Sequence, residues 1–290
     1  MILVHFSKEG TKRVVDLHDT FQGQTVILVG GSPSLREQPI ELLTERGVLT
    51  MAMNNAATTI KPTLWVSSDN PNCYEPQILH DPSIMKFGSI AQASAKVNGT
   101  YYAHMPNMYF FIPEADIPWD EFVGGLRPSV PWYHNTLFVA IHILYQLGIR
   151  RIILAGSDFG FAAPSESKYD LVNGDMYAHK TSLGDLQRKW NLDLYNSQAK
   201  ELRLLKPIFE DAGLTLMDSS KNSRLAQTYE HVSLEKAVEL CKERFPKEML
   251  DPSSLPHCSK FAPKSIQKRI ANWPGHRVVD MLGNQDLKIG

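Results

Sequence analysis

Small polar residues follow four of the buried strands that the sequence predicts. They are Gly30, Gly31, Ser32 and Ser34; Asn54 and Asn55; Ser68, Asp69 and Asn70; and Ser157 and Asp158. The carboxyl ends of parallel strands meet at one edge of a sheet, so we expect these groups to converge. Amides and hydroxyls both donate and accept hydrogen bonds, as a ribose, a base or a phosphate requires. The scarcity of Lys and Arg there favours a ribose and base over a bare triphosphate.

The first of these groups ends the stretch Thr25–Leu35, in which a fully apolar strand stops at two glycines. Glycines permit a sharp turn and a close approach of the backbone to a ligand. A helix expected over Ile40–Arg46 would leave unpaired N–H groups facing the cleft, which favours a phosphate. The stretch is neither a Walker loop nor a complete dinucleotide fingerprint. An ordinary strand-to-helix turn would use the same glycines, so both interpretations stay open.

His179 is the histidine best placed for acid–base chemistry. It follows Tyr177 in residues 160–184, which we expect to form a lid over the cleft. A histidine there could take a proton from an acceptor hydroxyl near neutral pH. An exposed loop histidine without a role would have the same sequence context. His134 is a second candidate, and no closely spaced set of Asp, His or Cys predicts a metal site.

The elements that carry these groups alternate between strands and helices. Helical periodicity marks His134–Leu147, Asp185–Ala212 and Val232–Arg244. Apolar runs predict buried strands at Thr25–Val29, Val48–Met53, Thr63–Ser67, Ile84–Phe87, Arg151–Ala155 and Leu214–Met217. This alternation indicates an α/β fold: a doubly wound, mostly parallel Rossmann-like sheet of roughly six strands, with a lid and a helical C-terminal extension.

We expect one domain over residues 1–245, including the lid at 160–184, and a linker with a basic tail over residues 246–290. The tail carries Lys264, Lys268 and Arg269. Such a segment could lie on an anionic membrane or touch DNA phosphates. A solvated helix packed on the domain would have the same composition.

The overall composition is that of a globular protein, with 43% hydrophobic and 21% charged residues among 290. A net charge of −1 argues against a globally basic nucleic-acid binder. No apolar stretch reaches the roughly 18–20 residues of a membrane helix. The three cysteines lack metal-ligand spacing and predict no structural disulfide. With no basic leader at the N-terminus, we expect a cytoplasmic protein, peripheral to a membrane if the tail binds one.

A series of motifs between about residue 25 and residue 225 resembles bacterial lipo-oligosaccharide sialyltransferases and the related motility-accessory-factor proteins. Val29–Leu35 is similar to the Gly-x-Gly-Pro-Ser-Leu opening of that family, and Asn54 stands where the family has a cleft asparagine. His134–Thr136 with Gly156–Phe159 resembles the family's Thr-Ser-Gly helix and the strand that ends in Gly-Ile-Asp-Phe. Tyr177–His179 resembles its lid motif Tyr-x-x-His, and Asp218–Ser223 resembles its Pro-Asn-Ser ending.

The resemblance implies a metal-independent, inverting glycosyltransferase without a cofactor, which takes a sugar from a nucleotide donor, typically CMP-sialic acid. It implies that His179 is the general base and that tyrosines, here Tyr177 and Tyr169, hydrogen-bond the departing phosphate. The residues expected at the donor are Gly30, Gly31, Ser32, Ser34, Asn54, Asn55, Ser68, Asn70, Asn135, Thr136, Ser157 and Asp158.

The sequence departs from the family at three places. The family's asparagine or glycine-proline pairing in the first loop is Gly31-Ser32 here. Gly160 replaces the tyrosine after Asp-Phe, and Tyr177 is one residue nearer to His179 than in the family. The donor is therefore defined only as a nucleotide sugar. The acceptor, a glycan or a modified nucleic-acid hydroxyl, and a homo-oligomeric state are left open.

Two other functions stay open. A pyrophosphokinase-type nucleotide transferase would need metal-binding carboxylates, for which the sequence offers Asp69 and Asp158. A non-catalytic nucleotide-binding module is the third interpretation, and the presence of His179 counts against it.

Overall fold

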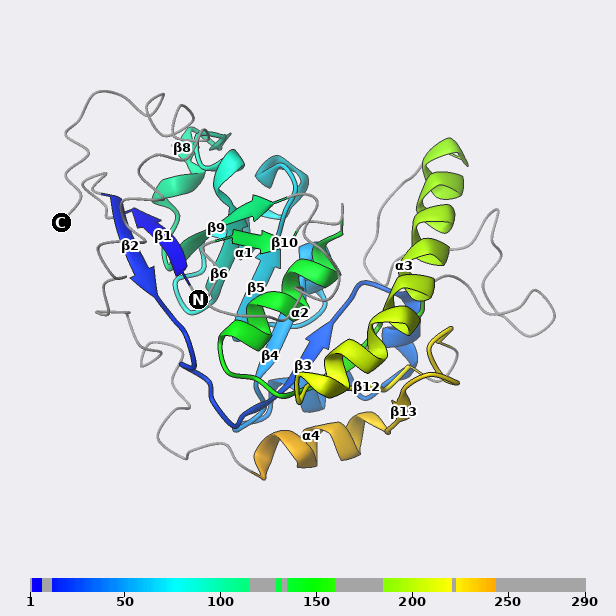
Figure 1. Cartoon of the computed structure of the whole chain (residues 1–290). Coiled ribbons are helices and arrows are strands. Elements are labelled where there is room, and N and C mark those ends of the chain that lie inside the picture. The colour runs from blue at the N-terminus through cyan, green and yellow to red at the C-terminus, as the bar shows by residue number, and fades with distance from the viewer. Residues whose placement is uncertain are drawn as a thin grey trace. The chain divides into compact units, whose positions relative to one another are not determined.

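The computed structural model describes residues 2–6, 12–114, 129–131, 135–159, 185–220 and 223–243, without the side chains of residues 2 and 185–192 (Figure 1). The described residues form two compact units. The first unit contains residues from Met1–Gln22 and Thr63–Ile149. The second contains residues from Gly23–Pro62 and Arg150–Pro246. The extents predicted for the domain, residues 1–245, and for the tail, residues 246–290, stay predictions.

The second unit is built on a parallel sheet in the order β13-β12-β11-β3-β4. Every side chain of β3 is buried, as a central strand of a parallel sheet requires. Its neighbour β11 is buried after its first residue. The strands are β3 (Thr25–Val29), β4 (Thr50–Met53), β11 (Arg151–Ala155), β12 (Thr215–Asp218) and β13 (Glu230–His231).

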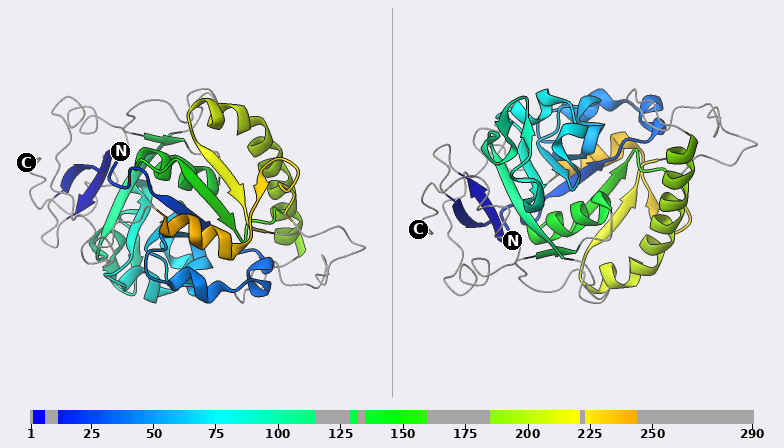
Figure 2. Two further views of the ribbon diagram at one scale, coloured as in Figure 1. Left: turned by 90° about the horizontal axis from the view of Figure 1, so that it is seen from below. Right: turned by 90° about the horizontal axis from the view of Figure 1, so that it is seen from above.

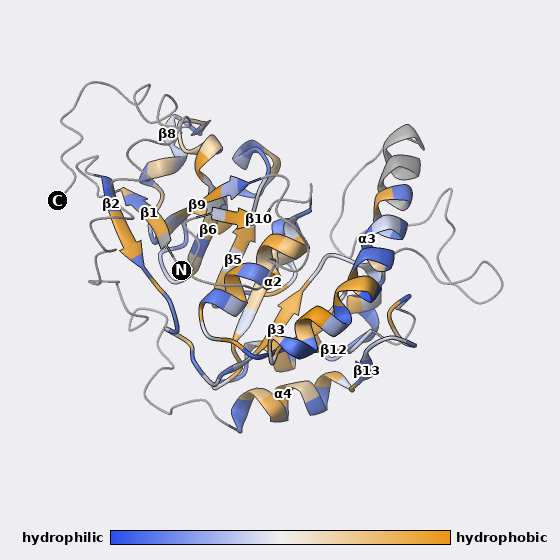
Figure 3. Ribbon diagram, viewed as in Figure 1, coloured by the Kyte–Doolittle hydropathy of each residue, from blue (hydrophilic) through white to orange (hydrophobic). Residues whose placement is uncertain are grey.

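Helices cover both faces of this sheet. Helix α3 (Asp185–Asp211) packs against β12, and α4 (Leu234–Lys242) packs against β3 on the opposite face (Figure 2). Ser233 caps α4 by accepting a hydrogen bond from the Lys236 N–H at 3.2 Å. The apolar stripe of α4 faces the strands and its charged face is exposed, as Figure 3 shows.

The first unit contains parallel and antiparallel strands in the order β5-β6-β9-β1-β2, with β10 beside β9. The pairs β5–β6, β6–β9 and β9–β10 are parallel, whereas β9–β1 and β1–β2 are antiparallel. The strands are β1 (Ile2–Phe6), β2 (Lys12–Asp16), β5 (Leu64–Ser67), β6 (Met85–Ser89), β9 (Met108–Glu114) and β10 (Ser129–Pro131).

Helix α2 (Thr136–Gln146) is buried on nearly all sides and packs against β5 and β10. Asn135 caps it by accepting from the Leu137 N–H at 2.8 Å. The other elements of this unit are the short helix α1 (Pro76–His80) and a separate hairpin of β7 (Lys96–Val97) and β8 (Thr100–Tyr101).

The predicted α/β, mostly parallel, Rossmann-like fold is confirmed. The predicted number of strands is too low, because the described residues contain thirteen. Most of the additional strands are short or antiparallel; the exception is β9, whose apolar run Met108–Ile112 pairs in parallel with β6. The lid at 160–184 and the C-terminal extension lie outside the described residues. Among those residues, none of the helices is both long enough and apolar enough to span a bilayer.

The helix predicted over Ile40–Arg46 begins at Ile40, but it is a short 3-10 helix, η2 (Ile40–Thr44). Another 3-10 helix, η1 (Pro33–Glu37), precedes it. Pro39 separates them, because proline disfavours the helical conformation in the residue before it. Gln38 is accordingly extended, with φ −107° and ψ 153°.

Candidate functional site

The loop after β3 is bound to the end of β11 through Asp158. Ser34 Oγ donates to Asp158 Oδ1 at 2.5 Å, and the Ser34 N–H donates to Oδ2 at 3.3 Å. In return the Asp158 N–H donates to Ser32 Oγ at 3.1 Å. Ser34 and Asp158 lie 124 residues apart in the sequence and come together because β3 and β11 are paired from Thr25↔Arg151 to Val29↔Ala155. The predicted convergence holds for these two strand ends.

The glycines of this region allow the two strand ends to approach each other. A Cβ on Gly30 would lie 2.4 Å from the Gly156 carbonyl oxygen and 2.7 Å from Ser157 Oγ. Gly156 has φ +60°, and a Cβ there would lie 2.4 Å from Leu35 Cγ. A larger residue at either position would clash with its neighbours, so packing requires both glycines whether or not a ligand binds.

Most backbone N–H groups of the loop have acceptors within the protein. Gly30 donates to the Ala155 carbonyl at 2.8 Å and Ser32 to the Gly156 carbonyl at 2.9 Å. Leu35 donates to the Ser32 carbonyl at 3.2 Å. The prediction of a helix N-terminus with unpaired donors is therefore wrong for these residues. Gly31 is the loop residue whose N–H has no acceptor among the described residues, and its backbone is partly exposed.

Asn54 and Asn55 begin η3 (Asn54–Thr58) directly after β4. Because β4 pairs with β3, with Val29 opposite Ala52, both asparagines lie at the same sheet edge as the Gly30–Leu35 loop. Asn54 has φ +52°, a conformation that asparagine tolerates better than most residues. Both are partly exposed, so the structure places them where a ligand can reach them.

Asp218, at the end of β12, is a fully buried carboxyl that the predicted site does not include. Its Oδ1 accepts from the Ser220 N–H at 3.0 Å, and its Oδ2 has no hydrogen-bond partner among the described residues. Ser220 Oγ accepts from the Ser157 N–H at 3.4 Å, which joins the β12 end to the β11 end. The signal was in the sequence, because Asp218-Ser219-Ser220 also follows a buried strand.

Burial dominates the electrostatics of this cluster. It raises the pKa of Asp218 to about 6, and the nearby Asp158 carboxyl contributes in the same direction. Hydrogen bonds from Ser223 and Ser220 partly oppose that rise in pKa. Burial also raises the pKa of Asp158, opposed by its bonds to Ser34. The two carboxyls are thus a buried acidic pair held by hydroxyl and amide donors.

The polar groups after β5 and before α2 belong to the first unit. Asn70 Oδ1 accepts from the Asn72 N–H at 3.0 Å and so caps the turn η4 (Pro71–Cys73). The buried atoms Ser68 Oγ and Asn135 Nδ2 have no hydrogen-bond partner among the described residues. Thr136, the first residue of α2, is buried. A donor-binding role for these four residues, and the convergence of all four strand ends, stay predictions.

The carboxyl pair that a metal-dependent transferase would need is engaged in internal hydrogen bonds. Asp69 Oδ2 accepts from Tyr74 Oη at 3.1 Å, and both oxygens of Asp158 accept from Ser34. Within the described ranges, no three His, Cys, Asp or Glu side chains gather into a set that could hold a metal. The predicted catalytic residues His179, Tyr177 and Tyr169, and the second candidate His134, lie outside the described residues.

Three solved structures of known glycosyltransferases are similar to this chain. The MAf glycosyltransferase of Magnetospirillum magneticum AMB-1 has a TM-score of 0.43 and 15% identity over 81% of this chain. The chain spans 40% of the length of that protein. The sialyltransferase CstII of Campylobacter jejuni with CMP-3FNeuAc has a TM-score of 0.40 and 17% identity, over 72% of this chain and 86% of its own. The same enzyme with cytidine-5'-monophosphate has a TM-score of 0.42 and 14% identity, over 86% and 98%.

No family model and no curated protein sequence matches the chain. Because the TM-scores are below 0.5, the assignment of activity rests on the residues of this chain.

Burial divides the predicted donor residues of the second unit into two groups. Ser34, Ser157 and Asp158 are buried, and Ser34 and Asp158 bond to each other. Gly31 and Ser32 are partly exposed, as are the two asparagines after β4. The exposed group offers backbone N–H, hydroxyl and amide groups, which suit a ribose, base or phosphate. The buried group fixes the backbone that presents them.

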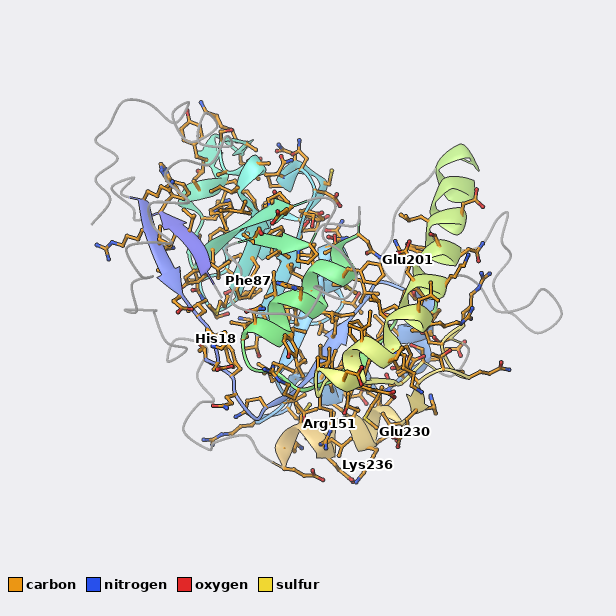
Figure 4. All side chains as sticks on the ribbon, in the orientation of Figure 1. His18, Phe87, Arg151, Glu201, Glu230 and Lys236 are labelled. Atoms are coloured by element: carbon orange, nitrogen blue, oxygen red, sulfur yellow. The ribbon has the colours of Figure 1, made fainter. Side chains whose placement is uncertain are left out.

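Figure 4 places Arg151 at the opposite end of β11, beside α4. Its guanidinium lies 3.9 Å from Glu243, so it belongs to the packing of α4 and not to the candidate site.

Proposed function

We propose that this protein is a metal-independent, inverting glycosyltransferase that moves a sugar from a nucleotide donor to an acceptor hydroxyl. The observation that carries the proposal is the hydrogen-bonded assembly of Ser32 and Ser34 with Asp158 at the carboxyl edge of a parallel sheet. Ligands bind at this edge in open α/β sheets. The resemblance to sialyltransferases assigns both of these segments to the donor site.

The donor is CMP-sialic acid or a similar nucleotide sugar. Gly31, Ser32, Asn54 and Asn55 would bind its ribose, base or phosphate, because these residues are partly exposed and carry neutral hydrogen-bonding groups. Neutral residues of this kind bind a nucleotide through the placement of their hydrogen bonds and not through net charge. The acceptor is a glycan or a modified nucleic-acid hydroxyl, and the basic tail is proposed to bring the enzyme to the anionic surface that carries it.

In the proposed reaction His179 takes the proton of the acceptor hydroxyl. The acceptor oxygen attacks the anomeric carbon from the face opposite to the nucleotide phosphate, and the bond from that carbon to the phosphate oxygen breaks. The phosphate leaves with the electron pair. The anomeric configuration inverts because the attack comes from the face opposite to the phosphate. Tyr177 and Tyr169 would donate hydrogen bonds to the departing phosphate, a role that a metal ion has in other enzymes.

Thermal unfolding with CMP, UDP, GDP and ATP, each with magnesium or with a chelator, tests this proposal. A ligand that binds the folded form raises the unfolding midpoint by mass action. We expect CMP or another sugar-nucleotide product to raise the midpoint equally with magnesium and with the chelator. A shift that requires ATP and magnesium would instead support the pyrophosphokinase alternative. If no nucleotide raises the midpoint, donor binding is wrong.

A further inference from the structure

The side chain of Asp158 is directed at Ser34, in the loop after β3. Its two oxygens accept from Ser34 Oγ and from the Ser34 N–H, and its own N–H donates to Ser32 Oγ. Its carbonyl oxygen accepts from the Arg224 N–H at 3.2 Å. Only 8% of Asp158 and 8% of Ser34 is exposed, so the bonds between them form in a nearly dry environment.

We propose that Asp158 is a positioning residue: it holds the Gly30–Leu35 loop in the conformation that presents the Gly31 N–H and the Ser32 backbone, and it does not contact the donor. What the loop binds rests on the function proposed above. The conformation of the loop is a property of this chain with or without a donor.

The loop needs such a support because its own secondary structure is weak. The 3-10 helix η1 has five residues, and Ser32 at its N-cap makes no side-chain hydrogen bond to it. Short 3-10 helices have poor hydrogen-bond geometry and little cooperativity. The other anchors are the backbone bonds from Gly30 and Ser32 to the Ala155 and Gly156 carbonyls, and the fully buried Leu35 side chain over Gly156. These contacts hold the two ends of the loop, whereas the Asp158 bonds hold the turn between Ser32 and Ser34.

A carboxylate suits this role better than a neutral group. It accepts two hydrogen bonds at once, and a bond from a hydroxyl to a carboxylate is short and strong, as the 2.5 Å distance from Ser34 Oγ indicates. An amide at this position presents one acceptor and one donor. The amide oxygen can still accept from the Ser34 N–H, whereas the amide nitrogen can only donate to Ser34 Oγ, which accepts in turn. Asp158→Asn therefore keeps the size of the side chain and replaces the short bond to a carboxylate by a weaker neutral one.

Asp218 offers the matched control. It is an aspartate at the end of the neighbouring strand, more deeply buried than Asp158, and it bonds to the Ser220 N–H instead of the loop. Asp218→Asn therefore changes the same buried cluster without changing a bond to residues 30–35. A purely structural role of Asp158 predicts that the two Asn variants behave alike.

Amide hydrogen exchange of the full-length protein, without nucleotide, tests the proposal. We expect Asp158→Asn and Ser34→Ala each to make exchange in residues 30–38 about tenfold faster, the effect of one lost charge-assisted hydrogen bond. We expect the double variant to exchange no faster than either single variant, because both changes remove the same bonds. Asp218→Asn should leave exchange in residues 30–38 unchanged. If Asp158→Asn does not fold, Ser34→Ala tests the same bonds from the loop side.

Nucleotide binding then separates positioning from direct contact. Asp158→Asn and Ser34→Ala should raise the Kd for CMP by similar factors, and Asp218→Asn should not. Unchanged loop exchange in Asp158→Asn, or an equal increase in Asp218→Asn, would overturn the proposal. Lost CMP binding with unchanged loop exchange would make Asp158 a donor ligand. If the wild type binds no nucleotide, the proposed function fails, and the exchange experiment still decides the role of Asp158.

Discussion

At the scale of single residues, burial separates groups that a ligand can reach from groups that hold those residues in place. By sequence, Ser34, Ser157 and Asp158 belong to the same class as Ser32 and Asn54, because all are small polar residues after buried strands. In the structure Ser34 and Asp158 bond to each other, and Ser157 Oγ is buried against the backbone of Gly30. Residue type was therefore informative about location at the sheet edge, but not about which residues face outward.

The His179→Ala variant tests the assignment of the general base. We expect turnover to fall at least about a hundredfold, the usual contribution of a general base, because the acceptor hydroxyl would keep its proton during attack. The CMP-induced rise in the unfolding midpoint should remain. His80→Ala, at the exposed end of α1, is the control and should retain turnover. Full turnover in His179→Ala would show that another group accepts the proton.

The raised pKa of Asp218 predicts a pH dependence of stability. Its pKa in the folded protein is about 6, above the ordinary value of 3.8. The folded state therefore binds this proton more tightly than the unfolded state, so the stabilisation is complete below pH 3.8 and is lost as the pH rises through 6. Asp218→Asn removes this titration.

Urea denaturation between pH 4 and pH 8 measures the effect. We expect the free energy of unfolding of Asp218→Asn, relative to the wild type, to increase by about 3 kcal/mol from the acid to the neutral end of that range, since each pKa unit corresponds to about 1.4 kcal/mol. A difference between variant and wild type that does not change with pH would mean that Asp218 titrates normally.

At the scale of elements, prolines decide the conformation of the chain after β3. Pro33 is the first residue of η1, and Pro39 stands directly before η2, so two short 3-10 helices form in place of one longer helix. The strands β3 and β11 and the helix α4 were predictable because long apolar or amphipathic runs specify them. The strands β2 and β13 were not, because they have no long apolar run of their own and depend on pairing with β1 and β12.

Gly30→Ala tests the close approach of the β3 and β11 ends. We expect the free energy of unfolding to fall by about 2 kcal/mol or more, because the new Cβ would meet the Gly156 carbonyl at 2.4 Å. We also expect the CMP-induced shift to disappear as the loop moves. Gly213→Ala is the comparison: its φ is +72° with open space around the Cβ, so it should lower stability by about 1 kcal/mol and leave the shift intact. A Gly30→Ala protein with normal stability would contradict the packing argument.

At the scale of the whole molecule, each unit is assembled from separate parts of the chain. The first unit takes residues from both sides of Gly23–Pro62, and the second joins that segment to Arg150–Pro246. The pattern of apolar residues indicates which segments become strands. Which strands pair with each other depends on packing between segments that are distant in the sequence.

Truncation after residue 245 tests the predicted boundary and the role of the tail. All described residues of the candidate site precede this position. We therefore expect the shortened protein to keep its CMP-induced shift and to lose binding to anionic vesicles or to DNA, whichever the full chain binds. Full-length protein in the same buffer is the reference. Loss of the CMP shift would show that residues 246–290 belong to the donor-binding part of the molecule.

The α/β class can be predicted from the amino-acid sequence alone, as can the polar groups that follow the strands and the buried strands β3, β4, β5, β6, β11 and β12. These features are local: a run of apolar side chains followed by glycine, serine or asparagine specifies a strand and its end. The bond between Ser34 and Asp158, the place of Asp218 opposite Leu154 and the need for a glycine at position 30 become visible in the folded molecule. Those facts depend on the pairing of β3, β11 and β12, which brings residues that are distant in the sequence into direct contact.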